Sequence, residues 1–354
     1  MVEFKKEIEA LVEITLKEGA SDLHITAGRK PSIRVSGELI PLISQPVLSE
    51  ADTKGLLLEL LNEEGKKEFL ENKDIDFAYD SPFGVRFRGN AFFQKGHVGG
   101  ALRVIPKKIR GVEELNLPSV LTEFAFKEQG FFLVVGPVGQ GKSTTLAAMI
   151  ELINKERAEH ILTIEDPIEY IFESDKSIID QREVRFDTES FQSAMKSMFR
   201  QDINVAMIGE MRTSETISTA VTAAETGHLI LSTLHTNNAA QTIDRIIDSF
   251  PGDQQGQIRV QLASTLIGVF SQRLIPRISG GLIPAYELLI NNSAVANLIR
   301  EGRTAEINVV IETGTESGMI DLNHSLSDLV RRGEITVESA MKFSLNPHSL
   351  ERLI

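Results

Sequence analysis

Cysteine is absent from the 354-residue sequence, which excludes disulfides and metal sites built on thiolates. No apolar stretch approaches the ~18 residues that a membrane-spanning helix needs. The first residues mix charges and lack the apolar core of an export signal. Internal repeats and low-complexity segments are missing as well. From these absences we expect a cytoplasmic protein without a transmembrane segment.

Positive charge is scarce relative to negative charge. The chain has 37 Lys and Arg against 50 Asp and Glu, a formal net charge of −13 and an isoelectric point near 5.2. Because neutralisation of phosphates dominates affinity for nucleic acids, so acidic a chain is a poor general polyanion binder. We therefore expect no nucleic-acid partner, although a local basic groove would escape this argument.

The pattern of apolar residues divides the chain into two domains and a linker. Residues 1–106 combine amphipathic helices with short alternating strands, which predicts an α+β domain. Residues 107–117 begin with a polar, basic stretch that suits a linker. Residues 118–354 alternate helices with short apolar strands, which is typical of an α/β domain, and are helical from about residue 293.

Residues 136–144 fit the phosphate-loop pattern G-x-x-x-x-G-K-[ST] at every fixed position. Glycines let backbone N–H groups curl around a phosphate, the lysine can reach the β- and γ-phosphates, and the serine hydroxyl can ligate Mg²⁺. An apolar run precedes the loop and a helical pattern follows it, which argues against a chance glycine turn. The segment predicts a site for a nucleotide with Mg²⁺, formed by Gly136, Pro137, Val138, Gly139, Gln140, Gly141, Lys142, Ser143 and Thr144.

Carboxylates follow two of the predicted strands, where ligands bind in an open α/β sheet. Glu210 follows an apolar strand at 205–208, and we expect it to orient the water that attacks the nucleotide. Glu165 and Asp166 follow the strand at 160–164 and are the second choice, acting through Mg²⁺-bound water or by direct polarisation. The alternative for Asp166 is that it caps a helix.

His228 and His235 bracket a further predicted strand. Two histidines near a phosphate site could sense the γ-phosphate or link neighbouring sites, whereas a histidine at a strand end is usually just a hydrogen-bonding residue. No carboxylate lies at the spacing of a zinc motif from either of them, so we do not expect zinc. Both histidines remain candidates for contact with the nucleotide.

Arg86 and Arg88 lie two residues apart on a predicted strand and so share one face of it. Neighbouring arginines repel unless an anion or acidic partners lie close by. The residues alone favour a solvated strand face. The alternative is that the two arginines reach the phosphates of a neighbouring subunit as arginine fingers, with Arg103 a weaker candidate.

Several segments taken in order resemble one known family over nearly the whole chain. They are GASDLHI (19–25), IRVSGEL (33–39), the phosphate loop, LTIEDPIEY (162–170), IGEMR (208–212), TAAETGHLILSTLHTN (222–237) and AVANLIRE (294–301). Together they resemble the type IV pilus retraction ATPases, the PilT family within the type II/IV secretion ATPases. The segments at 162–170, 208–212 and 222–237 are similar to the Asp box, Walker B segment and His box of that family.

The resemblance implies a homohexameric motor that hydrolyses ATP with Mg²⁺ and powers pilus retraction and twitching motility. Each subunit would pair a PAS-like N-terminal domain with a RecA-like P-loop ATPase domain. Arg86, Arg88 and Arg103 would complete a nucleotide site between the two domains. The ring would be cytoplasmic and peripheral, docked on the inner-membrane platform protein at the base of the pilus.

Some positions depart from the usual family pattern and leave an accessory paralogue open; they are Val138, Gln140, Ile203, Asn204, Thr213 and Ala296. A pilus extension or type II secretion ATPase is the nearest alternative, but such proteins usually carry a longer N-terminal region and a tetracysteine zinc module. A RecA-like nucleic-acid motor fits the acidic balance poorly. A nucleotide-binding module without turnover conflicts with the intact Lys142, Ser143, Glu165 and Glu210.

Overall fold

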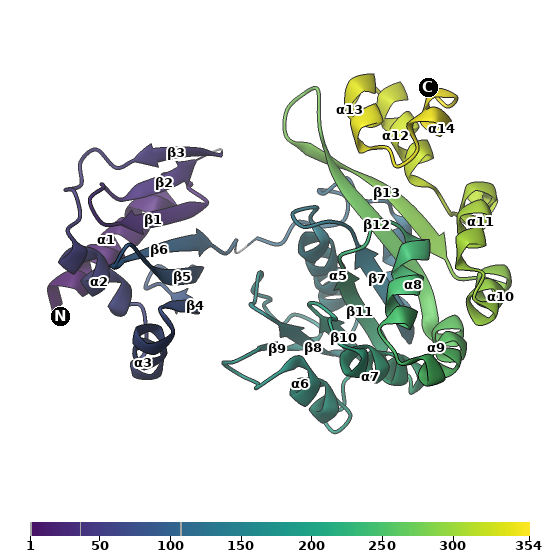
Figure 1. Ribbon diagram of the computed structural model, residues 1–354, viewed down its shortest axis with the longest axis horizontal. Helices are drawn as coiled ribbons and strands as arrows, with labels where there is room; N and C mark the ends of the chain where they lie inside the picture. Colours follow the sequence, from purple (N-terminus) through teal and green to yellow (C-terminus); the bar gives the residue numbers. More distant parts are fainter. Residues whose placement is uncertain (1, 36, 107) are drawn as a thin grey trace. The chain divides into compact units, whose positions relative to one another are not determined.

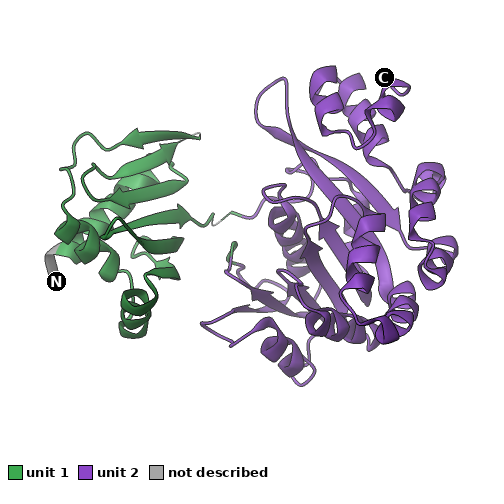
Figure 2. Cartoon of the chain, viewed as in Figure 1, with its two compact units in different colours: residues 1–108, 169–171 green, residues 109–168, 172–354 purple. Residues whose placement is uncertain are grey.

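The computed structural model describes residues 2–35, 37–106 and 108–354, which form two compact units (Figures 1 and 2). Unit 1 comprises residues 1–108 and 169–171, and unit 2 comprises residues 109–168 and 172–354. Among the described residues, no helix combines the length and the apolar character that crossing a lipid bilayer would require.

Unit 1 is an antiparallel sheet of six strands, ordered β3-β2-β1-β6-β5-β4, with helices packed against one face. Leu23 and Ile25 of β1 are fully buried on that face together with Ile8 of α1 and Leu56 of α2, because side chains alternate along a strand. Polar residues of β1 therefore occupy the other face. The elements are α1 (Val2–Lys17), β1 (Asp22–Thr26), β2 (Ser32–Val35), β3 (Glu38–Pro41), α2 (Glu50–Leu58), α3 (Glu63–Asn72), β4 (Asp74–Asp80), β5 (Arg86–Gln94) and β6 (His97–Val104).

Unit 2 is built on a seven-stranded sheet, ordered β13-β12-β7-β11-β10-β8-β9. Neighbouring strands run parallel except for the edge pair β12–β13, which is antiparallel. The strands are β7 (Gly130–Val135), β8 (His160–Glu165), β9 (Ile178–Glu183), β10 (Val205–Ile208), β11 (Leu229–Leu234), β12 (Leu266–Pro276) and β13 (Leu282–Ile290).

Helices cover both faces of this sheet, which explains why its central strands are continuously apolar. Phe131 and Leu133 of β7 face the core shared with α6–α9, whereas Phe132 packs on Phe124 of α4 with ring centroids 4.5 Å apart. The helices of unit 2 that come before β12 in the described chain are α4 (Val120–Ala125), α5 (Lys142–Glu156), α6 (Phe191–Met198), α7 (Ser214–Glu225), α8 (Ala239–Asp248) and α9 (Gly252–Thr265). The α/β fold class expected for this region is confirmed.

The C-terminal region is helical and packs in two places. Helix α10 packs on α9. Helices α12–α14 cover the half of the β12–β13 hairpin next to its turn, through Ile275, Ile283 and Leu326 (Figure 1). The helices are α10 (Ser293–Glu301), α11 (Ile307–Thr313), α12 (Leu322–Arg331), α13 (Val337–Phe343) and α14 (Pro347–Glu351), with 3₁₀ turns at Thr304–Glu306 and Thr315–Ser317. Helix α10 is the first element after β13 in the described chain.

Candidate active site

The phosphate loop joins the carboxyl end of β7 to the start of α5. Gly136, Gly139 and Gly141 have φ angles of +149°, +77° and +79°, which L side chains rarely adopt. Gly141 is the N-cap of α5, and no described side chain caps that helix. The amide groups of its first turn therefore point to the loop, where the helix dipole favours an anion.

The other predicted loop residues lie around this turn. Pro137 is half-buried, whereas Val138 is 80% exposed at the tip. Ser143 and Thr144 are half-buried in the first turn of α5. The Ser143 hydroxyl therefore belongs to the same end of the helix as the glycine loop.

Lys142 lies folded against the loop that it would serve. Its Nζ donates to the carbonyl oxygens of Gly136 and Pro137, each at 2.9 Å, and lies 3.2 Å from Nδ1 of His235. An ammonium group can only donate, so Nδ1 accepts and the imidazole proton lies on Nε2. The phosphate loop is thereby connected to the segment that follows β11.

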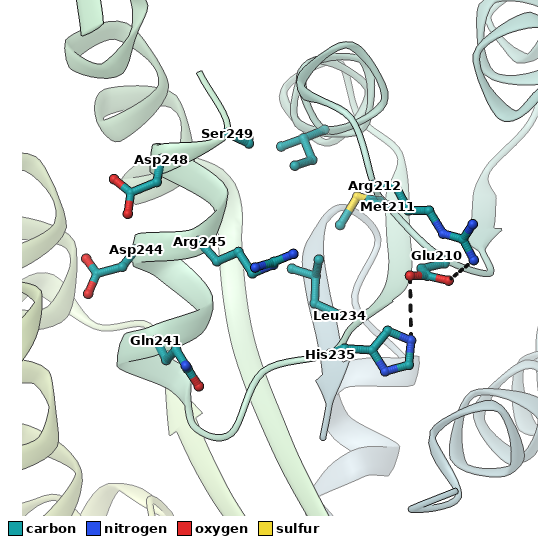
Figure 3. A pocket seen from close by; sticks show the side chains of 11 residues that line it. Glu210, Met211, Arg212, Leu234, His235, Gln241, Asp244, Arg245, Asp248 and Ser249 are labelled. Atoms are coloured by element: carbon teal, nitrogen blue, oxygen red, sulfur yellow. Dashed lines mark hydrogen bonds and ion pairs between the residues drawn. The ribbon is translucent and has the colours of Figure 1, made fainter. Parts of the chain in front are cut away.

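His235 continues this connection to Glu210. Its Nε2 lies 3.5 Å from Oε1 of Glu210, and Arg212 donates to Oε2 of the same carboxylate at 2.8 Å (Figure 3). Burial and the Lys142 charge lower the pKa of His235, so the ring is neutral at neutral pH. Burial alone would raise the pKa of Glu210, but the hydrogen bond and charge of Arg212, with Lys142, hold that pKa below its ordinary value. An ionised carboxylate thus lies beside a neutral imidazole.

Glu165 ends β8, which pairs with β10 so that Ile164 lies opposite Ile208. Its side chain is 6% exposed and accepts from Thr163 Oγ1 at 2.7 Å and Gln181 Nε2 at 3.2 Å. Since β7, β8, β10 and β11 are parallel, Glu165 and the residues that follow the other strands lie at one edge of the sheet.

Asp166 is exposed at the same edge. The hydrogen bond to Glu210 and the charge of that carboxylate chiefly raise the pKa of Arg212, and the charge of Asp166 adds to the effect. The alternative that Asp166 caps a helix is wrong, because the described chain contains no helix between β8 and β9. The segment after Asp166 is irregular.

The structure does not bring His228 to this edge. His228 precedes β11, so the six residues of that strand, about 20 Å of chain at ~3.3 Å each, separate it from His235. Its Nδ1 lies 2.9 Å from the Ala223 carbonyl, and its ring meets Phe199 edge-on at 5.7 Å. The structure therefore separates His228 from the phosphate loop and from His235, and its contact with a nucleotide stays a prediction.

The three candidate arginines all belong to unit 1. Arg88 and Arg103 lie opposite each other on β5 and β6, and Arg86 shares their face of the sheet. Arg103 Nε donates to Asp22 at 2.8 Å, and Arg86 lies 3.4 Å from Asp80. Asp22 and Asp80 of unit 1 therefore offset part of the repulsion that the sequence predicts between the neighbouring arginines.

Sequence and structure comparisons assign the family. Residues 108–338 match the family described as "Type II/IV secretion system protein". The chain is 43% identical to the type IV pilus retractation ATPase PilT of Pseudomonas aeruginosa, over 97% of this chain and 99% of that protein. The chain belongs to the PilT family of type II/IV secretion ATPases. It is also 42% identical to the type IV pilus ATPase PilU of the same organism, over 98% of this chain and 91% of that one.

Solved structures agree with membership of the PilT family. The crystal structure of the pilus retraction motor PilT with bound ADP is similar at a TM-score of 0.91 and 43% identity, covering 97% of this chain and 98% of that chain. The X-ray structure of the Legionella pneumophila ATPase DotB is similar at a TM-score of 0.82 and 27% identity, covering 94% and 93%. The similarity therefore extends across both units of the chain.

Strand β12 contributes residues that the sequence did not single out. Gln272 Nε2 donates to the Gln140 carbonyl at 2.8 Å, and Gln272 Oε1 accepts from Thr145 Oγ1 at 2.7 Å. The Leu274 amide donates to Gln140 Oε1 at 2.8 Å. The phosphate loop of this PilT-family protein is thus braced from β12. In the sequence, the polar Gln-Arg pair inside the apolar run at 266–276 could have indicated that this strand contacts the site.

The carboxyl end of the sheet, where Glu210 and His235 lie, opens onto a pocket of about 660 Å³ beside α8 (Figure 3). Glu210 and His235 lie on one side of it, and Arg245 points toward it from α8. The lining residues are Glu210, Met211, Arg212, Ile217, Leu234, His235, Gln241, Asp244, Arg245, Asp248 and Ser249. The pair formed by Glu210 and His235 is therefore accessible to solvent from the side facing α8.

The donor set at this edge suits Mg²⁺, which prefers oxygen ligands and retains bound water. A serine hydroxyl and two carboxylates, from Ser143, Glu165 and Glu210, belong to the same edge of the sheet. Within the described ranges, no group of three His, Asp or Glu side chains forms a metal cage. Phosphate oxygens and water would therefore have to supply the other ligands.

Proposed function

We propose that this protein is an ATP-hydrolysing motor that powers type IV pilus retraction by removing pilin subunits, and so supports twitching motility. The support is similarity over nearly the full chain to the retraction ATPase PilT of P. aeruginosa and to the twitching motility protein of Neisseria gonorrhoeae. The solved PilT structure has bound ADP. ATP is accordingly the substrate that we propose for this chain.

The observation that carries the proposal is the contact series Lys142–His235–Glu210–Arg212 at the carboxyl edge of the sheet. The glycine-loop amides and Lys142 would hold the triphosphate of ATP. Glu210 would orient the attacking water and accept its proton, because Arg212 keeps the carboxylate ionised. When Lys142 turns toward a phosphate, Nδ1 of His235 loses the Lys142 donor, so this contact no longer holds the imidazole in place.

Mg²⁺ would offset the charge that develops on the phosphates. Ser143 would ligate this ion directly, and Glu165 and Glu210 would reach it through water. Asp166 is exposed, and its negative charge would help to keep Arg212 protonated. These roles use only oxygen donors that belong to the carboxyl edge of the sheet.

For the assembly we propose a homohexamer in which unit 1 is a PAS-like domain and unit 2 a RecA-like ATPase domain. The ring would be cytoplasmic and peripheral at the inner membrane, docked on the platform protein of the pilus machine. Arg86 and Arg88 would reach a nucleotide as arginine fingers. Arg103 is the weaker candidate, because its Nε is engaged by Asp22 at 2.8 Å.

Turnover of ATP by the purified full-length chain tests the enzymatic part. Lys142→Ala should abolish nucleotide binding or turnover. Glu210→Ala should bind ATP and hydrolyse it about 10²–10⁴-fold more slowly, since a positioned base is lost. Glu312→Ala, which removes an exposed carboxylate of α11, is the matched control and should keep wild-type rates. Normal turnover by Glu210→Ala would remove Glu210 from the mechanism.

Subunit mixing tests whether the arginines act in trans. If Arg86 serves the site of a neighbour, mixing Arg86→Ala subunits with Lys142→Ala subunits should restore part of the activity through hybrid sites. Absence of restoration at every mixing ratio would count against action across an interface.

Gene deletion tests the biological output. Hyperpiliation without twitching would support retraction, whereas loss of surface pili would point to an extension ATPase. An accessory role is the second candidate, because PilU matches this chain about as well as PilT does, at 42% against 43% identity. Near-normal twitching after deletion would favour that role. Stimulation of turnover by single-stranded DNA, falling steeply with salt, would instead indicate a nucleic-acid motor.

A further inference from the structure

Strand β12 contacts two loops of the active site through its two faces. Gln272 binds the phosphate loop at Gln140, as described above. Ser271 and Arg273 point to the other face and bind Asn237: the serine hydroxyl donates to its carbonyl at 2.9 Å, and Arg273 Nη2 donates to its Oδ1 at 3.0 Å. One strand therefore holds the loops that carry Lys142 and His235.

Glu287 provides a second hold on the segment after His235. It lies on β13 opposite Ser271, is 7% exposed, and accepts the backbone N–H of Ala239 at 2.7 Å. Ala239 is the first residue of α8, four positions after His235. Residues 235–239 are thus fixed at Asn237 by β12 and at Ala239 by β13.

A buried carboxylate at this place has no role in the proposed hydrolysis itself. Burial, aided by the Asp321 charge and opposed by the Ala239 N–H and the Arg273 charge, raises the pKa of Glu287 to about 7. Asp321 is the N-cap of α12 and is itself paired with His324. Both protonation states of Glu287 retain an oxygen that can accept from Ala239, so glutamine is a fair substitute for it.

We infer that Glu287 is a positioning residue for His235. By accepting the Ala239 N–H, it fixes residues 235–239 and keeps the imidazole between Lys142 and Glu210. The inference rests on the proposed ATP hydrolysis for its kinetic consequence, but not for its structural one.

Two substitutions at Glu287 separate the hydrogen bond from the charge. Glu287→Ala removes the acceptor and should lower kcat for ATP by between about 10- and 100-fold, the loss expected from a small misplacement of reacting groups. The KM for ATP should stay within about twofold, because Gln272 still braces the phosphate loop. Glu287→Gln keeps the acceptor and should restore kcat to within about threefold of the wild type.

The position of His235 is measured directly by NMR titration of ¹³C-labelled histidine in the full chain without nucleotide. The seven histidines give few ring signals, and the His235→Ala variant assigns the relevant one. In the wild type this ring should titrate below 6.5, because burial and Lys142 lower its pKa. In Glu287→Ala the pKa should move toward 6.5 as the ring leaves both, whereas in Glu287→Gln it should stay low.

Each outcome decides the inference. A wild-type His235 titration in Glu287→Ala overturns it, even if the variant melts earlier, because the carboxylate is then merely structural. Equal damage from Ala and Gln also overturns it. If Glu287→Ala does not fold, Glu287→Met removes the same acceptor while keeping most of the side-chain volume, and it should shift the titration in the same direction. Absence of ATP turnover in the wild type would defeat the proposed function and leave the titration result standing.

Discussion

Replacing Gly136 by alanine tests how closely β12 is packed on the phosphate loop. Its φ of +149° lies in a region open almost only to glycine, and an alanine held there costs roughly 1–3 kcal/mol. The added Cβ would lie 2.6 Å from the carbonyl oxygen of Gln272. Because that oxygen belongs to the backbone of β12, the strand must shift, which adds about 1–3 kcal/mol of overpacking.

Gly139→Ala in the same loop is the matched control. Its φ is +77°, but a Cβ there would meet no atom within 4 Å, so only the left-handed backbone cost of about 1–2 kcal/mol applies. In a domain of this size, each kcal/mol lowers the melting temperature by roughly 2–4 °C. The central values of these costs differ by about 2.5 kcal/mol, so we expect Gly136→Ala to melt roughly 5–10 °C below Gly139→Ala in calorimetry of the nucleotide-free protein. Equal melting temperatures would refute the close packing of β12 on the loop.

Three further results are expected. His235 has a lowered folded pKa, so its ring stays neutral and supports turnover above that pKa; the turnover rate should decline as the pH falls through the folded pKa, and this decline should vanish in His235→Ala. Gln272→Ala should raise the KM for ATP by about 3- to 30-fold with a smaller effect on kcat, because the Gln140 carbonyl loses the donor that Gln272 supplies. Asp22→Ala should destabilise unit 1 by about 0.5–1 kcal/mol in urea titrations followed by circular dichroism, because the exposed Arg103 guanidinium loses its carboxylate partner; an unchanged midpoint would show that this pair contributes no stability.

The parts of the fold that could be predicted were those encoded by neighbouring residues. The continuous apolar run of β7 indicated a strand buried on both faces, and Phe131 and Phe132 are indeed buried on opposite sides. The spacing of glycine, lysine and serine in the phosphate loop was enough to predict a nucleotide site. Glu165 and Glu210 could be placed at one edge because parallel strands share a direction, and the structure puts both there.

Chain direction also explains why the structure separates His228 from His235. A residue that precedes a parallel strand lies at the amino end of the sheet, whereas ligands bind at the carboxyl end. His235 follows β11 and His228 precedes it, so bracketing the same strand places the two histidines at opposite edges. The direction of β11 was therefore enough to predict that His235, and not His228, lies beside the phosphate loop of the same chain.

What could not be predicted is the role of the β12–β13 hairpin, whose contacts join residues far apart in sequence. Gln272 meets Gln140 across 132 positions, and Glu287 meets Ala239 across 48. No spacing rule relates such positions. A consequence follows for interpreting variants: a substitution in β12 should resemble a defect of the phosphate loop if it changes Gln272, and a defect of the His235 segment if it changes Arg273. Adjacent strand residues point to opposite faces, so substitutions at neighbouring positions of β12 should alternate in effect. One should mainly weaken nucleotide affinity and the next should mainly lower the turnover rate. A strand that is buried but does not hold the two loops would show no such alternation.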